Sequence, residues 1–397
     1  MNRRKRRPNY FGWILFVLIV LFGYYFNQVY LPTQPNPFIP TPTPTRSPES
    51  YITEAQSLYQ QGKLLPAIDA YQAAINSSPQ DPTLYVDLAR IQVFAGQYVD
   101  AEKNAQNALL LNPNNALANG VLAWALSFQD GKNSDAMASI EKALSLDPNS
   151  GLLHAYNVEI LIDSGFDGVV KAIDESKVAL ALDPNIVETH RARALLLEET
   201  GNYEEAIAEY LAAIKINQNI PALYIGLGVN YRQVGVYDQA ITAFTNANSL
   251  NPADPLPDLY ISRTYATIGE YAKALQYAET AVQDRPDSAS LRGNLGVLYY
   301  LNYQWNDAAQ QLGYTIYGGV TQDGVTIEGI PLSDDIFVAE YYYTYGLSLA
   351  RTNQCGEALP IAQMLQTRFP ANGTDLNQTI LAKADEIYSI CSENLSG

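Results

Sequence analysis

The sequence predicts an all-α protein whose helix hairpins stack into a solenoid. The first observation is a small residue that opens the second helix of each hairpin at steps of about 34 residues. It stands at Ala67, Ala101, Ala136, Ala172, Ala206, Ala240, Ala274, Ala308 and Ala358. The second observation is a series of prolines that close the second helices, at Pro79, Pro113, Pro148, Pro184, Pro252, Pro286 and Pro370, with Gln218 at the matching distance between Pro184 and Pro252. Because one hairpin cannot bury its own apolar face, nine in phase predict a continuous stack.

The hairpin of residues 221–252 shows the pattern most clearly. Its first helix has one packing face, formed by Tyr224, Leu227, Gly228 and Tyr231. After a break at Gly235 and Tyr237, a second face is formed by Ala240, Phe244 and Ala247. Small residues let the two helices lie close together, and the larger rings fill the space around them. This unit resembles the tetratricopeptide repeat.

The resemblance implies a right-handed superhelix of about nine repeats with a concave inner surface. We expect repeats one to eight in residues 50–317 and repeat nine in residues 336–371. Residues 372–397 then form a capping helix and tail, with an inward stripe at Ile380, Ala384, Ile387 and Cys391. Such a cap shields the open end of a solenoid.

The charge of the chain argues against nucleic-acid binding. The net charge is −17, and five of the basic residues lie in residues 3–7, so 19 basic residues face 41 acidic ones in the rest. That surface repels phosphate. With only two histidines and two cysteines, no metal site or catalytic cluster can be assembled, and we expect no cofactor. His154 and His190 are therefore expected to be packing or surface residues.

The N-terminus predicts a single-pass membrane anchor. A basic segment, residues 1–9, precedes residues 10–30, which carry no charge. About 20 apolar residues span a bilayer as a helix. The positive-inside rule places the N-terminus in the cytoplasm and the repeats outside it, at the cell membrane. The alternative of a cleaved signal peptide lacks a small-residue cleavage site after Phe26, and an interfacial helix would need a polar face.

The next segment, residues 31–49, contains seven prolines among threonines. Such a composition favours an extended rod of about 3.1 Å per residue, although a plain disordered linker would also serve as a spacer.

The repeat period fails in residues 318–335. Asp323 and Gly324 lie there between β-forming residues, which predicts a hairpin turn. A long insertion in a regular array can carry function, and it can also be a surface excursion. Both interpretations remain open.

The two cysteines are expected to meet. Cys355 lies near the start of the last repeat's second helix, and Cys391 lies near the end of the capping helix. If these helices run antiparallel, the start of one meets the end of the other, and a disulfide is permitted outside the cytoplasm. The alternative is two buried thiols. Glycosylation sequons begin at Asn372, Asn377 and Asn394.

In the family that the chain resembles, the first helix of each repeat lines a groove that binds a protein or peptide. The corresponding sites here are Asp87, Arg90, Arg191, Glu198, Tyr260, Arg263, Asn294, Tyr300 and Tyr343. Tyr260, Tyr300 and Tyr343 are expected to form an exposed ladder. The lysines of the family's clamp for a C-terminal carboxylate have no counterpart at the inward sites.

We therefore expect a membrane-anchored scaffold or adaptor that is not an enzyme. One alternative is an accessory subunit of a cell-envelope enzyme, in carbohydrate or secretion machinery, that acts through residues 318–335. A second alternative is a self-associating structural array.

Overall fold

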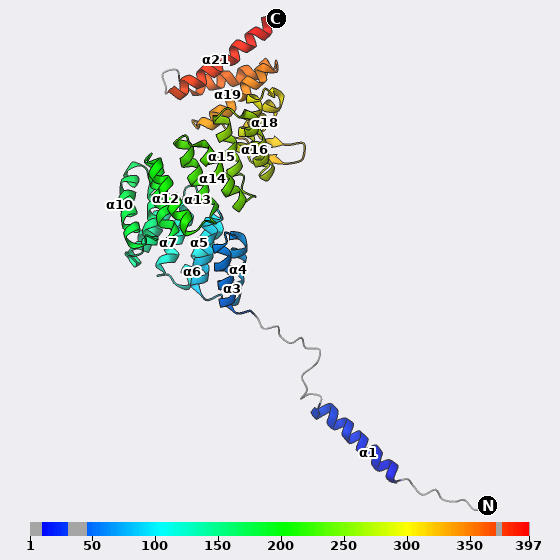
Figure 1. Ribbon diagram of the computed structural model, residues 1–397. Coiled ribbons are helices and arrows are strands. Elements are labelled where there is room, and N and C mark those ends of the chain that lie inside the picture. Colours follow the sequence, from blue (N-terminus) through cyan, green and yellow to red (C-terminus); the bar gives the residue numbers. More distant parts are fainter. Residues whose placement is uncertain (1–9, 31–45, 371–374, 397) are drawn as a thin grey trace, which may run out of the picture. The chain divides into compact units, whose positions relative to one another are not determined.

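The computed structural model describes residues 10–30, 46–370 and 375–396 (Figure 1). The basic residues 1–9, most of the predicted linker (residues 31–45) and the sequon at Asn372 lie outside this part of the chain. The chain divides into two compact units, residues 1–47 and 48–397, and each is considered by itself.

The first unit is the N-terminal helix. Helix α1 (Tyr10–Tyr25) continues into one π-helical segment (Phe26–Tyr30), and neither contains a charged residue. The stretch from Phe11 to Gln28 is long and apolar enough to cross a membrane, and none of its residues is buried within the protein. Length and composition therefore suit an anchor, as they also suit a signal sequence.

The second unit consists of consecutive helix pairs, which confirms the predicted fold class. Within the described residues, nine pairs are followed by a final helix, α21 (Asp375–Ser396). The first helices of the pairs are α3 (Pro48–Gln60), α5 (Pro82–Phe94), α7 (Ala116–Ser127), α9 (Gly151–Ile162), α11 (Val187–Glu199), α13 (Pro221–Gln233), α15 (Leu256–Thr267), α17 (Ala289–Leu301) and α19 (Ile336–Arg351). The second helices are α4 (Leu64–Ser77), α6 (Tyr98–Leu111), α8 (Asn133–Leu146), α10 (Phe166–Leu182), α12 (Tyr203–Ile216), α14 (Tyr237–Leu250), α16 (Tyr271–Asp284), α18 (Trp305–Tyr317) and α20 (Cys355–Arg368).

Close approach of the paired helices depends on the small residues of the repeat. In the pair α13 and α14, a Cβ at Gly228 would stand 2.5 Å from the ring of Phe244, so only glycine fits there. The turn between these helices needs a left-handed residue, which Gly235 supplies at φ +77°. The alanines that open the second helices, such as Ala240, are fully buried.

Successive repeats are joined by a recurring hydrogen bond. A side chain in the first turns of a first helix bonds to the carbonyl oxygen of the residue six positions earlier, in the loop that precedes the helix. The pairs are Tyr85 with Pro79, His154 with Pro148, His190 with Pro184, Tyr224 with Gln218, and Arg292 with Pro286. Both histidines thus hold neighbouring repeats together.

The insertion forms the predicted hairpin. Strand β1 (Gly319–Val320) pairs antiparallel with β2 (Thr326–Ile327). The segment that follows β2 is bonded to the array, because the amide of Ile330 donates to the carbonyl oxygen of Thr315 at 2.8 Å. The hydroxyl of Tyr342 also donates to the carbonyl of Ile330, at 2.9 Å.

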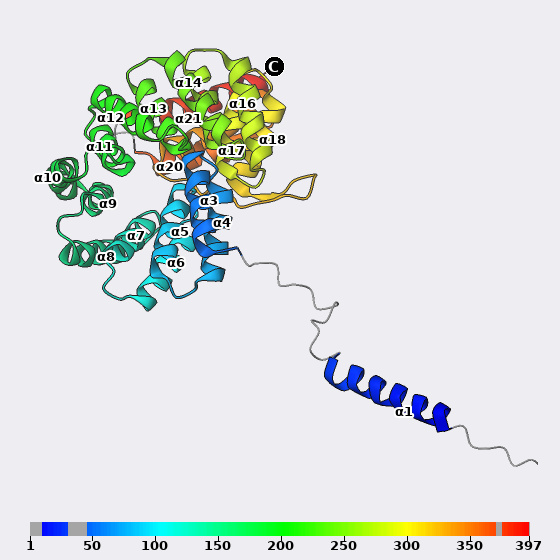
Figure 2. The same cartoon turned by 60° about the horizontal axis from the view of Figure 1, so that its bottom comes forward.

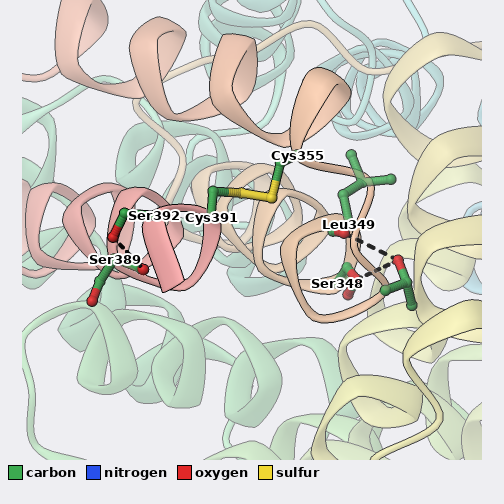
Figure 3. Close-up of a disulfide and its surroundings, with 7 residues drawn as sticks. Ser348, Leu349, Cys355, Ser389, Cys391 and Ser392 are labelled. Atoms are coloured by element: carbon green, nitrogen blue, oxygen red, sulfur yellow. Dashed lines mark hydrogen bonds between the residues drawn. A yellow bond between two sulfur atoms is a disulfide. The ribbon is translucent and has the colours of Figure 1, made fainter. Parts of the chain in front are cut away.

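Helix α21 covers the end of the stack with the predicted stripe. Ile380, Ala384, Ile387 and Cys391 are all buried. A disulfide joins Cys391 to Cys355, the first residue of α20, with a Cα–Cα distance of 5.5 Å (Figure 3). The end of the capping helix is therefore tied covalently to the start of the last repeat's second helix.

Candidate ligand-binding groove

The predicted groove residues all lie on first helices, which follow one another round the inside of the curved array (Figure 2). Two of them are on α5 and two are on α11, in the N-terminal half of the array. The other five are on α15, α17 and α19, in the C-terminal half. The two halves present different inner surfaces.

In the N-terminal half the array closes on itself. Both Nε and Nη2 of Arg90, on α5, donate to one carboxylate oxygen of Glu188, which lies on α11 and is 98 residues away in sequence. The Glu188 side chain is only 1% exposed. The side-chain amide of Asn219 also donates to the carbonyl of Gln60 at 2.6 Å, across 159 residues. Repeats one and two therefore contact repeats five and six.

Several further side chains of this closed turn bond to one another. Arg191 donates to both carboxylate oxygens of Glu159 at 2.6 and 2.7 Å, and the indole of Trp124 donates to the same carboxylate at 2.6 Å. Trp124 also stacks on Tyr156, with ring centroids 4.5 Å apart. Burial raises the pKa of Glu159, although the Arg191 charge opposes this. Arg90 and Arg191 were expected to face a groove, and both are bonded within the protein. The Arg191 side chain is 13% exposed, whereas that of Arg90 is 31% exposed and also lines a cavity.

Glu198 is also engaged internally. It accepts a hydrogen bond from the amide of Asn230 at 2.8 Å and one from the hydroxyl of Tyr210 at 3.3 Å. Burial raises the pKa of its carboxyl group. Asp87 differs from these residues, because it lines a separate cavity beside Arg90.

The inner face of the C-terminal half contains an open cavity of about 170 Å³. Its walls come from α13, α15, α17 and α19, so four successive repeats contribute to it. The charged, amide and aromatic residues of this surface, which we call the C-terminal groove, are Arg232, Arg263, Asn294, Phe337, Glu340 and Tyr341, and Thr267 also lines it.

Two guanidinium groups dominate the electrostatics of the C-terminal groove. The Arg263 guanidinium lies 3.9 Å from the centroid of the Phe337 ring, and its Nε donates to Asn294 at 3.4 Å. Burial and the like charge of Arg263 lower the pKa of Arg232. Neither arginine has an ion-pair partner within the described residues. Two poorly compensated positive charges thus share a cavity of an acidic protein.

The same cavity also contains one carboxyl group, that of Glu340. Burial raises the pKa of Glu340, although its hydrogen bond from Tyr343 and the nearby Arg263 charge oppose this. It accepts a hydrogen bond from the hydroxyl of Tyr343 at 3.4 Å. Two arginines and one glutamate line the cavity, so positive groups outnumber negative ones there, which favours an anionic ligand.

The expected ladder of exposed tyrosines is not present. Tyr260, on α15, packs against α14, where its ring stacks on that of Phe244 with the ring centroids 5.2 Å apart. Tyr300 and Tyr343 are half-buried against the hydrophobic core of the last two repeats. Tyrosine serves packing at all three positions.

Four groove residues escaped sequence reasoning: Arg232, Phe337, Glu340 and Tyr341. Arg232 lies one helical turn beyond the position that corresponds to Arg263 one repeat later, so helical periodicity could have found it. The other three follow the insertion, where the repeat period is lost. No cluster of three or more histidine, cysteine, aspartate or glutamate side chains that could hold a metal ion occurs in the described part of the chain.

Comparison with known proteins identifies the repeats. A family model described as TPR repeat matches residues 199–235, and one described as Tetratricopeptide repeat matches residues 86–151 and 259–323. No curated protein matches the chain.

Several solved structures are similar to it. The human IFIT1 dimer with PPP-AAAA has a TM-score of 0.57 at 15% identity, covering 88% of this chain and 83% of that one. A tetratricopeptide repeat protein from Parabacteroides merdae has a TM-score of 0.42 at 17% identity, covering 63% and 98%. PilF of Pseudomonas aeruginosa has a TM-score of 0.42 at 24% identity, covering 50% and 90%. The likeness to IFIT1 is one of fold.

Proposed function

The chain is a tetratricopeptide repeat protein, and we propose that it is a membrane-anchored scaffold. In this role it binds a protein partner and catalyses no reaction. Repeat solenoids present extended concave surfaces to their partners. In the N-terminal half of that surface, Arg90, Arg191 and Glu198 are bonded to other side chains of the protein, so we assign the partner to the C-terminal groove.

The observation that carries this proposal is the pair Arg232 and Arg263. Both guanidinium groups line one cavity, and the structure provides neither with an ion-pair partner among the described residues. A carboxylate would compensate both charges, and arginine binds carboxylates through paired hydrogen bonds. Phe337 adds an apolar wall under Arg263. The ligand that fits is an acidic segment of a partner protein.

The location that we propose for this binding is outside the cytoplasm. Helix α1 carries no charged residue, and the basic residues precede it in sequence. The positive-inside rule then orients the chain with its N-terminus in the cytoplasm. The disulfide between Cys355 and Cys391 is compatible with an oxidising compartment.

Photo-crosslinking in intact cells tests the proposal. A photoreactive phenylalanine analogue replaces Thr267, which is exposed and lines the C-terminal groove. The matched control replaces Thr280, an exposed threonine on α16 that does not line this cavity. We expect a discrete crosslinked partner from position 267 alone, lost when Arg232→Gln and Arg263→Gln are combined. The same adducts from both positions, or none from either, would refute groove binding.

A further inference from the structure

A second cavity lies at the other end of the array. Its volume is about 510 Å³, within the roughly 300–1,000 Å³ range of ligand pockets. Residues of α3, α4 and α5 line it, and its mouth is formed by the exposed polar side chains of Gln56, Ser57 and Gln60. We call this cavity the N-terminal pocket. It shares no residue with the C-terminal groove.

One carboxylate in the N-terminal pocket has no bonded partner among the described residues. Asp87 has neither a hydrogen-bond nor an ion-pair partner for its side chain within the described residues. Arg90 is its neighbour on α5, but both donating nitrogens of Arg90 are turned to Glu188. Burial raises the pKa of Asp87 and outweighs the opposing charge of Arg90, so the charged carboxylate has a desolvation cost. A cation entering the pocket would relieve that cost.

The walls of the pocket suit an alkyl chain that ends in a cation. Tyr59 and Tyr71 line the pocket together with Asp87, so it contains two aromatic rings and a carboxylate. Burial, together with the nearby Asp87 charge, raises the pKa of Tyr71 to about 12, so this phenol stays neutral near pH 7. Aromatic rings beside a carboxylate offer apolar contact to methylene groups and favourable electrostatics to a positive end.

We infer that the N-terminal pocket binds a lysine or arginine side chain of a partner protein, with Asp87 as its counter-charge and Tyr59 and Tyr71 as its walls. This site is distinct from the proposed C-terminal groove and takes a ligand of the opposite charge. An elongated partner carrying both acidic and basic segments could engage both sites.

The net charge of the N-terminal pocket depends on the contact between Arg90 and Glu188. With Glu188 bonded to Arg90, these two charges balance and the charge of Asp87 is left over. If the contact opened, Arg90 would be free to neutralise Asp87 itself, three residues away on the same helix. Cation binding and the contact between repeats two and five should therefore support each other.

Saturation-transfer NMR on the full chain in detergent micelles tests the inference. The probes are three blocked tripeptides whose central residue is lysine, arginine or norleucine, and free spermidine serves as a non-peptide cation. Asp87→Asn removes the counter-charge with little change in shape. Asp100→Asn is the matched control, because Asp100 is an exposed carboxylate on the neighbouring helix α6.

We expect the lysine and arginine peptides to bind and the norleucine peptide to give no signal. Asp87→Asn should weaken binding about tenfold, the loss expected of one charge-assisted hydrogen bond. Asp100→Asn should leave binding unchanged. Equal binding of the norleucine peptide, unchanged binding by Asp87→Asn, or binding of spermidine without either basic peptide would overturn the assignment.

A second variant guards against a folding defect in Asp87→Asn. Gln56→Lys places an ammonium group at the exposed mouth of the pocket, where it can occupy the site from within the chain. We expect this variant to fold, as judged by circular dichroism, and to block both basic peptides. Undiminished binding by folded Gln56→Lys would contradict the inference.

Discussion

Arg90 and Glu188 form a largely buried ion pair that joins the second repeat to the fifth, 98 residues later. A solenoid whose repeats touched only their neighbours would have no such contact. The pair closes the N-terminal half of the array into a turn.

Removing one partner of this pair should open the turn. Arg90→Met leaves Glu188 buried and unpaired, and breaking such a pair costs about 3–5 kcal/mol. We expect faster amide hydrogen exchange in α3, α5 and the start of α11, measured by mass spectrometry on the full chain. Exchange in α17 to α20 should stay as in the wild type.

The control is the double variant Arg90→Met with Glu188→Met. Replacing both charges by apolar groups of similar size removes the desolvation cost, so protection should largely return. Protection that is as low in the double variant as in Arg90→Met, or unchanged in Arg90→Met itself, would show that the pair does not hold the turn.

His190 should make stability depend on pH. Its Nδ1 lies 2.6 Å from a carboxylate oxygen of Glu209, and its Nε2 lies 2.9 Å from the carbonyl oxygen of Pro184. The hydrogen bond to Glu209 raises the pKa of His190 in the folded protein. The stabilisation is therefore fully present below the unfolded pKa, about 6.5, and is lost as pH rises through the higher folded pKa.

The matched variant is His190→Tyr, because Tyr224 occupies the corresponding place in a later repeat and bonds to the carbonyl of Gln218. Tyrosine keeps the link between repeats but does not titrate near neutral pH. We expect urea unfolding between pH 6 and pH 8.5 to show a smaller loss of stability in the variant than in the wild type. An identical pH dependence in both proteins would exclude His190 as its source.

The disulfide should hold the capping helix in place. Cys355 and Cys391 close a loop with a sequence separation of 36, and the chain-entropy model assigns such a loop about 4 kcal/mol. Reduction should lower the thermal midpoint and increase proteolysis in α21. The double variant Cys355→Ala with Cys391→Ala should behave like the reduced protein and be insensitive to reductant. A reductant effect that persists in this variant would have another cause.

The sequence predicted the helix pairs, the capping stripe and the hairpin insertion because each depends on local sequence. The first two follow from helical periodicity, and the hairpin follows from the turn signal at Asp323 and Gly324. Ala240 and Gly228, for example, mark helix contacts that any stack of this kind requires. The repeating pattern also placed Asn294 and Arg263 on one inner face, where the structure brings them into one cavity.

The closure of the turn could not be predicted in this way. The curvature of the array is the sum of small rotations at every repeat, and no local pattern encodes the meeting of Arg90 with Glu188. The same limit applies to Tyr260, whose ring fills a gap beside Phe244 that depends on the spacing of two repeats. The place of Phe337 could not be predicted for a further reason. This residue follows the insertion, after which the repeat register can no longer be counted from the sequence.

The most direct test of the scaffold proposal is the affinity of the C-terminal groove for its partner. The segment recovered by crosslinking at position 267 can be synthesised as a peptide and titrated by calorimetry against the full chain in detergent. Arg285→Gln is the matched control, an exposed arginine that does not line the groove. We predict an acidic peptide whose binding weakens about tenfold or more with Arg232→Gln and Arg263→Gln combined, and is unchanged by Arg285→Gln. A peptide without acidic residues, or equal affinity for all three proteins, would contradict the account.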